Sequence, residues 1–225
     1  MDTHTPTPLL YSYYRSSCSA RVRAALHYKG IAYDTKPISL LKNEQHEAYK
    51  QHNPNGMVPM LVIDGHAISQ SAAILEYLEE TRPGKRLCIQ LITAVNDDED
   101  TAVNVEPPLL PKDPWTRAQP VQNLRLLNRV GDTKTEWARH WITVGFEALE
   151  AELVKTAGQY CVGDQITMAD VYLPPQVYNA QRFGVDMSRF PTIARIDRNL
   201  ASVEAFRQAH YSRQPDCPPE LRAQD

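Results

Sequence analysis

Residues 9–30 read LLYSYYRSSCSARVRAALHYKG and decide how the first half of the chain folds. Residues 9–14 are apolar and aromatic, which is typical of a short β-strand. The serine-rich stretch 16–19 then offers small hydroxyl side chains suited to capping a helix. Apolar residues recur at helical spacing as far as Leu26, and Lys29-Gly30 is a helix stop signal. The pattern predicts a strand leading directly into a helix that begins at the serines.

The same alternation continues to about residue 83. Further strands are expected at 31–35, 60–63 and 66–68, the last two joined by a hairpin at Asp64-Gly65. A short helix within 42–52 and a helix through 74–78 that ends near Pro83 complete the order βαβαββα. Strands connected through helices predict a mixed sheet with helices packed on its faces.

The second half of the chain shows helical patterns and no convincing strand. Apolar residues from Ala138 to Leu153 form one stripe of a long amphipathic helix, and Thr167 with Asp170 forms a capping-box variant that opens another. A third helix is marked by Ile193, Ile196 and Leu200. We therefore expect three segments: an α/β domain at 1–86, a linker or disordered insertion at 87–108, and an all-α domain at 109–225.

Composition excludes several classes of protein. The 225 residues include 24 Lys and Arg against 27 Asp and Glu, a net charge of -3 that does not suit nucleic acid or an anionic membrane. No apolar run approaches a membrane span, and the start MDTHTPTP does not resemble a signal peptide. The four cysteines lie far apart without metal-ligand spacing, so we expect no disulfide framework, no metal site, and a cytoplasmic location.

The serine turn is the first candidate site. Backbone N–H groups and the helix dipole stabilise negative charge at a helix N-terminus. A thiolate there, belonging to Cys18 or to a bound ligand, would have a lowered pKa, and the hydroxyls of Ser16 and Ser17 could donate hydrogen bonds to it. The alternative is that these are ordinary capping serines beside a buried cysteine.

Two further signals point to a peptide ligand. A cis Val58-Pro59 bond would leave the Val58 backbone free to pair with an extended peptide. Gln70-Ser71 begins the third helix, where the dipole and the Ser71 hydroxyl could hold a carboxylate. Together the three signals predict a small acidic thiol peptide lying across the ends of the sheet.

The run Tyr11–Arg23 resembles the active-site signature of the zeta-class glutathione transferases, the maleylacetoacetate isomerases. Other stretches match the same family in colinear order over most of the chain: 53–54, 58–59, 70–71, 76–83, 109–114, 122–124, 160–164, 167–170, 180–183 and 213–216. The SSCS and RVR pair is specific to this class, whereas Val-Pro and Gln-Ser occur across glutathione transferases generally.

The resemblance implies a thioredoxin-like domain that binds glutathione, followed by an α-helical domain, in a homodimer. Ser16 would hold the glutathione thiolate with Ser17 and Cys18 beside it, and Val58 would pair with the cysteinyl moiety. Gln70 and Ser71 would bind the γ-glutamyl end. The resemblance also places glutathione contacts at Ser19, Arg21, Gln119, Asn123, Leu124 and Arg125.

The implied reaction is the isomerisation of maleylacetoacetate, a small diacid, by thiolate addition, bond rotation and elimination. Arg15, Arg21 and Arg182 are the candidates for stabilising the developing enolate and for binding the substrate carboxylates. Alternatives are a maleylpyruvate isomerase, a catalytically impaired binding protein with this fold, and thiol exchange through Cys18. Tyrosines 11, 13 and 14 are interpreted as packing residues.

The chain departs from the family in two neighbouring places. Residues 87–108 are an insertion, and a long helix that the family has after Ala118 is missing. We interpret both as splicing or gene-model variation, which sequencing the transcript would test. A smaller gap makes Gln45 the nearest candidate for one further glutathione contact.

Overall fold

The computed structural model describes residues 6–39, 43–82 and 134–223. These residues divide into two compact units. The first unit combines the described residues up to 82 with residues 171–176 and 197–223, and the second contains residues 134–170 and 177–196. The domain boundaries expected at 86 and 108 lie outside the described residues and stay predictions.

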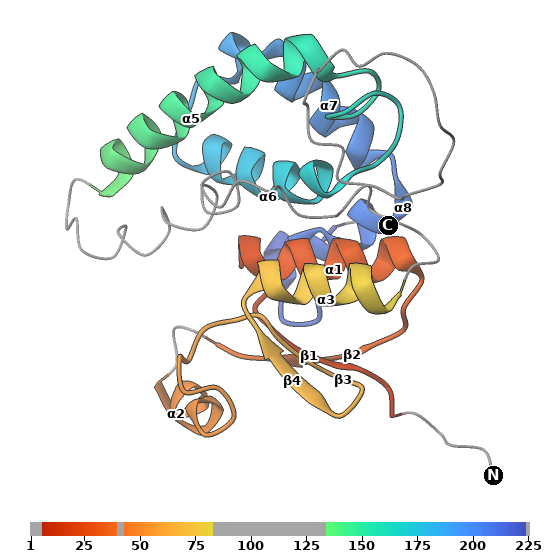
Figure 1. Cartoon of the computed structure of the whole chain (residues 1–225). Coiled ribbons are helices and arrows are strands. Elements are labelled where there is room, and N and C mark those ends of the chain that lie inside the picture. The colour runs from red at the N-terminus through yellow and green to blue at the C-terminus, as the bar shows by residue number, and fades with distance from the viewer. Residues whose placement is uncertain (1–5, 40–42, 83–133, 224–225) are drawn as a thin grey trace, which may run out of the picture. The chain divides into compact units, whose positions relative to one another are not determined.

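The first unit is built on a four-stranded mixed sheet (Figure 1). Its strands, in the spatial order β2-β1-β3-β4, are β1 (Leu9–Ser12), β2 (Asp34–Pro37), β3 (Met60–Ile63) and β4 (His66–Ser69). β1 runs parallel to β2 and antiparallel to β3, and β3 and β4 form an antiparallel hairpin. The βαβαββα order and the thioredoxin-like fold predicted from the sequence are confirmed.

Helices cover both faces of this sheet (Figure 1). α1 (Ser17–Lys29) and α3 (Ser71–Thr81) pack on one face, and α2 (Asn43–Lys50) lies on the other. On the α2 face, Tyr49 packs against Tyr11, with ring centroids 5.4 Å apart, and against Met60. Since side chains alternate along a strand, the fully buried Leu10 and Leu61 face α1 and α3.

Local chemistry explains the end of α1 and the turn between β3 and β4. α1 stops at Gly30, which adopts the left-handed conformation (φ 68°) that favours glycine. The β3–β4 turn has positive φ at both Asp64 and Gly65, as a two-residue hairpin requires.

The second strand begins later than predicted. Residues 31–35 were expected to form it, but β2 spans 34–37. The Ile31 N–H still donates to the Leu26 carbonyl at the end of α1, and the first bond to the sheet runs from the Asp34 N–H to the Pro8 carbonyl. The hydrogen bonds that close the helix therefore occupy the start of the predicted strand.

The second unit is helical in its described residues. Its elements are α5 (Lys134–Thr156), most of α6 (Met168–Arg182), the 3-10 turn η3 (Met187–Arg189) and the first part of α7 (Pro191–Ala201). The stripe predicted along α5 is confirmed: Ala138, Phe146 and Leu153 are buried, and the Phe146 ring meets Phe190 edge-on at 5.5 Å. In the part of the chain that the structure describes, no helix is both long and apolar enough to cross a membrane.

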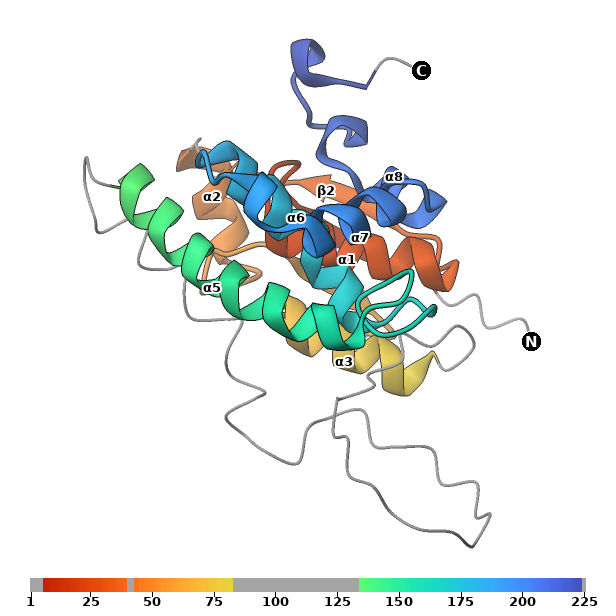
Figure 2. The same ribbon diagram turned by 90° about the horizontal axis from the view of Figure 1, so that it is seen from above.

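After α7 the chain forms α8 (Glu204–Ala209), η4 (Tyr211–Arg213) and η5 (Pro219–Leu221). Although these elements are last in the sequence, they belong to the first unit, where α8 packs along α1 (Figure 2). The end of the chain therefore contributes to the core of the sheet-containing unit.

The capping box at the start of α6 is confirmed. Asp170 is fully buried, and its carboxylate accepts hydrogen bonds from the Thr167 N–H (2.8 Å), the Thr167 hydroxyl (2.7 Å) and the Cys161 N–H (2.9 Å). A buried carboxylate needs such partners because it has lost its water. Asp170 thus joins the loop before α6 to the helix itself.

We expect Asp170→Ala to lower the free energy of unfolding by about 3 kcal/mol, because three donors would lose a charged acceptor in a buried place. Urea unfolding followed by circular dichroism measures the change. Glu152→Ala is the matched control: Glu152 lies in an exposed i,i+3 pair with Lys155, and its loss should cost less than about 0.5 kcal/mol. Equal stability of the two variants would contradict this prediction.

Candidate functional site

Three chain segments meet at one edge of the sheet in the first unit. Tyr11 near the end of β1 is paired with Met60 at the start of β3, and Met60 is paired with Ser69 at the end of β4. The residues that follow β1, precede β3 and follow β4 therefore leave the sheet at the same edge. These are the segments that contain Ser16, Val58 and Gln70-Ser71, so the register brings the predicted site together.

Ser16 is the N-cap of α1. Its backbone is extended (φ -72°, ψ 117°), and its hydroxyl oxygen accepts a hydrogen bond from the Ser19 N–H at 3.2 Å. Ser17 is buried and Cys18 is half-buried. The first N–H groups of a helix have no acceptor within it, so the N-terminus of α1 carries partial positive charge. Since α1 begins at this edge of the sheet, its positive end lies there. The capping serines and the predicted anion site are therefore the same segment of the chain.

Val58 is buried, and the Val58–Pro59 peptide bond is cis. The residue before it is anchored: the Met57 carbonyl accepts hydrogen bonds from the Tyr49 hydroxyl and from the Asn53 side-chain amide, both at 2.8 Å. Asn53, buried at the start of the turn, therefore fixes the approach to Val58.

Gln70 and Ser71 open α3. Gln70 has φ 76° and ψ 120°, a conformation that only glycine adopts without cost, although its side chain is exposed. Ser71, the first helical residue, is buried. Because backbone strain of this kind is concentrated at functional sites, the conformation of Gln70 supports its place among the predicted site residues.

Arg21 lies one turn into α1 and is buried. Its guanidinium carbon lies 4.4 Å from the centre of the Tyr172 ring, a cation–π contact, and its Nε has no hydrogen-bond partner among the described residues. Ser19 Oγ is likewise buried without a partner within the described part of the chain. Burial raises the pKa of Tyr172, an effect that the charge of Arg21 opposes.

Tyr172 was missed by sequence reasoning. It belongs to α6, about 150 residues from Arg21, and nothing in its local pattern distinguishes it from a packing tyrosine.

The other predicted arginines have different surroundings. Arg15 is half-buried, with its guanidinium 5.8 Å from the Tyr14 ring. Arg182 is exposed near the end of α6 in the second unit, beside Phe183. Their assignment to the substrate carboxylates stays a prediction. Several other predictions lie outside the described residues. They are the glutathione contacts at Gln119, Asn123, Leu124 and Arg125, the side chain of Gln45, the insertion 87–108 and the region after Ala118.

The tyrosines before the serine turn pack as expected. Tyr11 and Tyr14 are buried, and the Tyr13 and Tyr14 rings meet edge-on at 4.8 Å. Burial raises the pKa of Tyr13, which disfavours its ionised form.

Two helix N-termini and one cis-proline turn thus converge on one edge of the sheet. Each helix end favours a negative group, and the backbone beside a cis-proline can pair with an extended chain. This arrangement suits a short peptide that carries a thiolate and a carboxylate.

Comparison with known proteins agrees with this geometry. Residues 15–81 match the family described as "Glutathione S-transferase, N-terminal domain". The chain is 51% identical to "Probable maleylacetoacetate isomerase 2" of Drosophila melanogaster over 95% of this chain and 92% of that protein. The chain belongs to the maleylacetoacetate isomerase family, zeta-class glutathione S-transferases.

Solved members of the family share the fold. A maleylacetoacetate isomerase from Anaeromyxobacter dehalogenans 2CP-1, solved with glutathione in its active site, is 40% identical with a TM-score of 0.70, over 94% of this chain and 98% of that one. A maleyl pyruvate isomerase, described as a bacterial zeta-class glutathione S-transferase, is 34% identical with a TM-score of 0.73, over 93% of this chain and 100% of that one.

The strain at Gln70 can be measured. Gln70→Gly should be more stable than Gln70→Ala by about 1 kcal/mol, because glycine adopts φ 76° without steric cost while alanine keeps the strain. Neither change removes a buried side chain, since Gln70 is exposed. The midpoints of urea unfolding of the two purified variants measure this difference in stability. An alanine variant as stable as the glycine variant would show that the backbone at Gln70 is not strained.

Proposed function

We propose that this protein is a glutathione-dependent isomerase that converts maleylacetoacetate to fumarylacetoacetate, a step of phenylalanine and tyrosine breakdown, with glutathione transferase side activity. The observation that carries the proposal is the SSCS turn at the N-terminus of α1, in a chain that is 51% identical to a probable maleylacetoacetate isomerase. The helix N-terminus provides the electrostatic stabilisation that the chemistry requires.

The residues of this chain fit glutathione. Ser19 Oγ and Arg21 Nε are buried polar atoms without partners among the described residues, close to the start of α1. The N-termini of α1 and α3 favour the two kinds of anion, thiolate and carboxylate, that a γ-glutamyl thiol peptide carries. When bound, glutathione would supply the thiolate that adds to the cis double bond and is later expelled from the trans product.

Each part of the site has a proposed role in this reaction. Ser16 donates a hydrogen bond to the sulfur, and the N–H groups around Ser17 and Cys18 lower the pKa of the thiol. Val58 pairs through its backbone with the cysteinyl moiety, which fixes the sulfur relative to Ser16. The Gln70 backbone and the Ser71 hydroxyl hold the γ-glutamyl carboxylate at the N-terminus of α3.

The substrate is a diacid, so the site needs cations. Arg15 and Arg182 are proposed to bind its carboxylates, because a guanidinium fork matches a carboxylate in two hydrogen bonds. Arg21 is proposed to share this role and to stabilise the developing enolate from its buried position beside Tyr172. Glutathione contacts from Gln119, Asn123, Leu124 and Arg125 belong to the same proposal, as do a homodimer and a cytoplasmic location.

Maleylpyruvate isomerase is the second candidate, supported by the 34% identity and the TM-score of 0.73 to a maleyl pyruvate isomerase. Comparing kcat/KM for maleylacetoacetate and maleylpyruvate at saturating glutathione separates the two. Glutathione binding without turnover of either would favour the impaired binding protein. Assaying this chain beside one with the missing helix after Ala118 restored would then show whether that departure is the cause.

Ser16→Ala should lower kcat/KM of the isomerisation about a hundredfold and raise the pKa of bound glutathione thiol by at least about one unit, because a hydrogen bond to the thiolate is lost. Ser16→Thr is the matched control, since threonine keeps both the hydroxyl and the helix cap. Cis-to-trans conversion and the ultraviolet absorbance of the thiolate are the two measurements. Wild-type activity in Ser16→Ala would remove Ser16 from the mechanism.

Cys18→Ala distinguishes isomerisation from thiol exchange. If bound glutathione supplies the nucleophile, this variant should keep isomerase activity within about tenfold, because Cys18 is then an electrostatic neighbour and not the attacking group. Activity is compared with and without glutathione. Loss of all activity in Cys18→Ala, with glutathione still bound, would instead assign the covalent role to Cys18.

A further inference from the structure

The last residues of the chain contact the loop that leads to the serine turn. The Asp216 carboxylate accepts a hydrogen bond from the Tyr14 N–H at 2.8 Å, across 202 residues of sequence. Tyr14 lies between β1 and Ser16, in a stretch with no strand partner of its own. Asp216 belongs to the RQPD motif at 213–216, which the proposed function does not otherwise use.

Arg23 contacts the same loop. It is completely buried, and its guanidinium donates to Ser12 Oγ at 3.0 Å, to the Tyr14 carbonyl at 3.2 Å and to the Ala209 carbonyl at 3.1 Å. Burial lowers the pKa of Arg23 to about 10, while Asp216 and Tyr33 act in the opposite direction, so the group stays charged at neutral pH.

Both backbone groups of Tyr14 are therefore fixed by distant residues. Its N–H is bound by Asp216 and its carbonyl by Arg23. The neighbouring Tyr13 carbonyl accepts the Ser16 N–H at 2.9 Å, which links the held peptide to the helix cap. A loop with few internal hydrogen bonds thus acquires a defined conformation next to the residue proposed to bind the sulfur.

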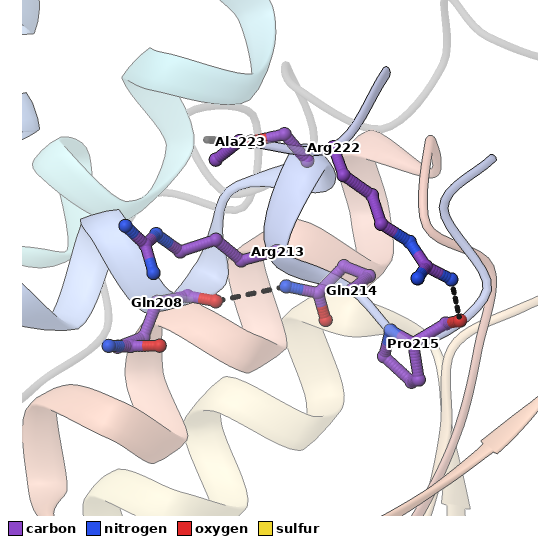
Figure 3. A pocket seen from close by; sticks show the side chains of 7 residues that line it. Gln208, Arg213, Gln214, Pro215, Arg222 and Ala223 are labelled. Carbon is purple, nitrogen blue, oxygen red and sulfur yellow. Dashed lines mark hydrogen bonds between the residues drawn. The ribbon is translucent and has the colours of Figure 1, made fainter. Parts of the chain in front are cut away.

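The chain end is itself held in a defined shape (Figure 3). The Gln214 side-chain amide donates to the Gln208 and His210 carbonyls at 2.9 and 2.8 Å. Arg222 donates to the Pro215 and Cys217 carbonyls at 3.3 and 3.0 Å, on either side of Asp216. Gln208, Gln214, Pro215 and Arg222 are among the residues that line an open pocket of about 420 Å³. The carboxylate of Asp216 is thus presented by a braced turn.

We propose that residues 204–223, the C-terminal clasp, set the position of Ser16 for catalysis, with Asp216 and Arg23 as positioning residues. The proposal rests on the proposed function of Ser16. Among the described residues, the hydrogen bond from Asp216 to the loop goes to its backbone, so removing the carboxylate truncates no side chain of the proposed site and acts through the position of the loop that holds Ser16.

Asp216→Ala tests the clasp. It should weaken glutathione binding about tenfold in calorimetry, because the loop that positions Ser16 loses the hydrogen bond from the Tyr14 N–H to a charged acceptor. It should also raise the pKa of the bound thiol and speed amide hydrogen exchange in residues 12–16. A purely structural role would lower stability without moving the thiol pKa. Asp216→Asn, which keeps a neutral acceptor, should shift each quantity in the same direction by less.

Glu220→Ala is the matched control, because Glu220 is an exposed acid of the same clasp without a contact to the loop in the described residues. If Asp216→Ala does not fold, as judged by circular dichroism, Asp216→Asn carries the test. Unchanged glutathione affinity and thiol pKa, or unchanged exchange in residues 12–16, would overturn the clasp. If the wild-type protein binds no glutathione, the proposed function fails instead, and the exchange measurement alone decides whether the clasp holds the loop.

Discussion

A fully buried guanidinium constrains the whole sheet-containing unit. Arg23 cannot be transferred from water without partners for its five N–H donors, and the acceptors it finds come from β1, from the loop after it and from the end of α8. Each acceptor must lie in the plane of a rigid fork, so the charge ties the Ser12 hydroxyl and the Tyr14 carbonyl to the Ala209 carbonyl near the other end of the chain.

The chemistry of the site follows from sheet topology. Because β1 and β3 are antiparallel and β3 and β4 form a hairpin, the chain enters α1, enters β3 and enters α3 at one edge. Two helix dipoles therefore act on the same small volume, next to the backbone of a cis-proline turn. Backbone groups at this edge can bind much of an anionic peptide. The site then depends on the identity of only a few side chains, such as Ser16 and Ser71.

Much of this could be predicted from local sequence. The serine cap, the Asp64-Gly65 hairpin, the stripe along α5 and the Thr167–Asp170 capping box all depend on residues within one or two turns of each other. The start of β2 was misplaced because two hydrogen-bonding patterns, helix closure and strand pairing, compete for the same few residues. Tyr172 could not be found, since its contact with Arg21 depends on packing between helices far apart in sequence.

The sequence by itself determined the element order, the two capped helix ends and the candidate anion site, because capping and hydrophobic periodicity are short-range properties of the chain. The tertiary structure decided the rest. It placed the Asp216 carboxylate on the Tyr14 N–H and buried the charge of Arg23 among carbonyls up to 186 residues away. Such contacts arise when packing removes water from polar groups and obliges them to find partners, and no local pattern records which partners they will be.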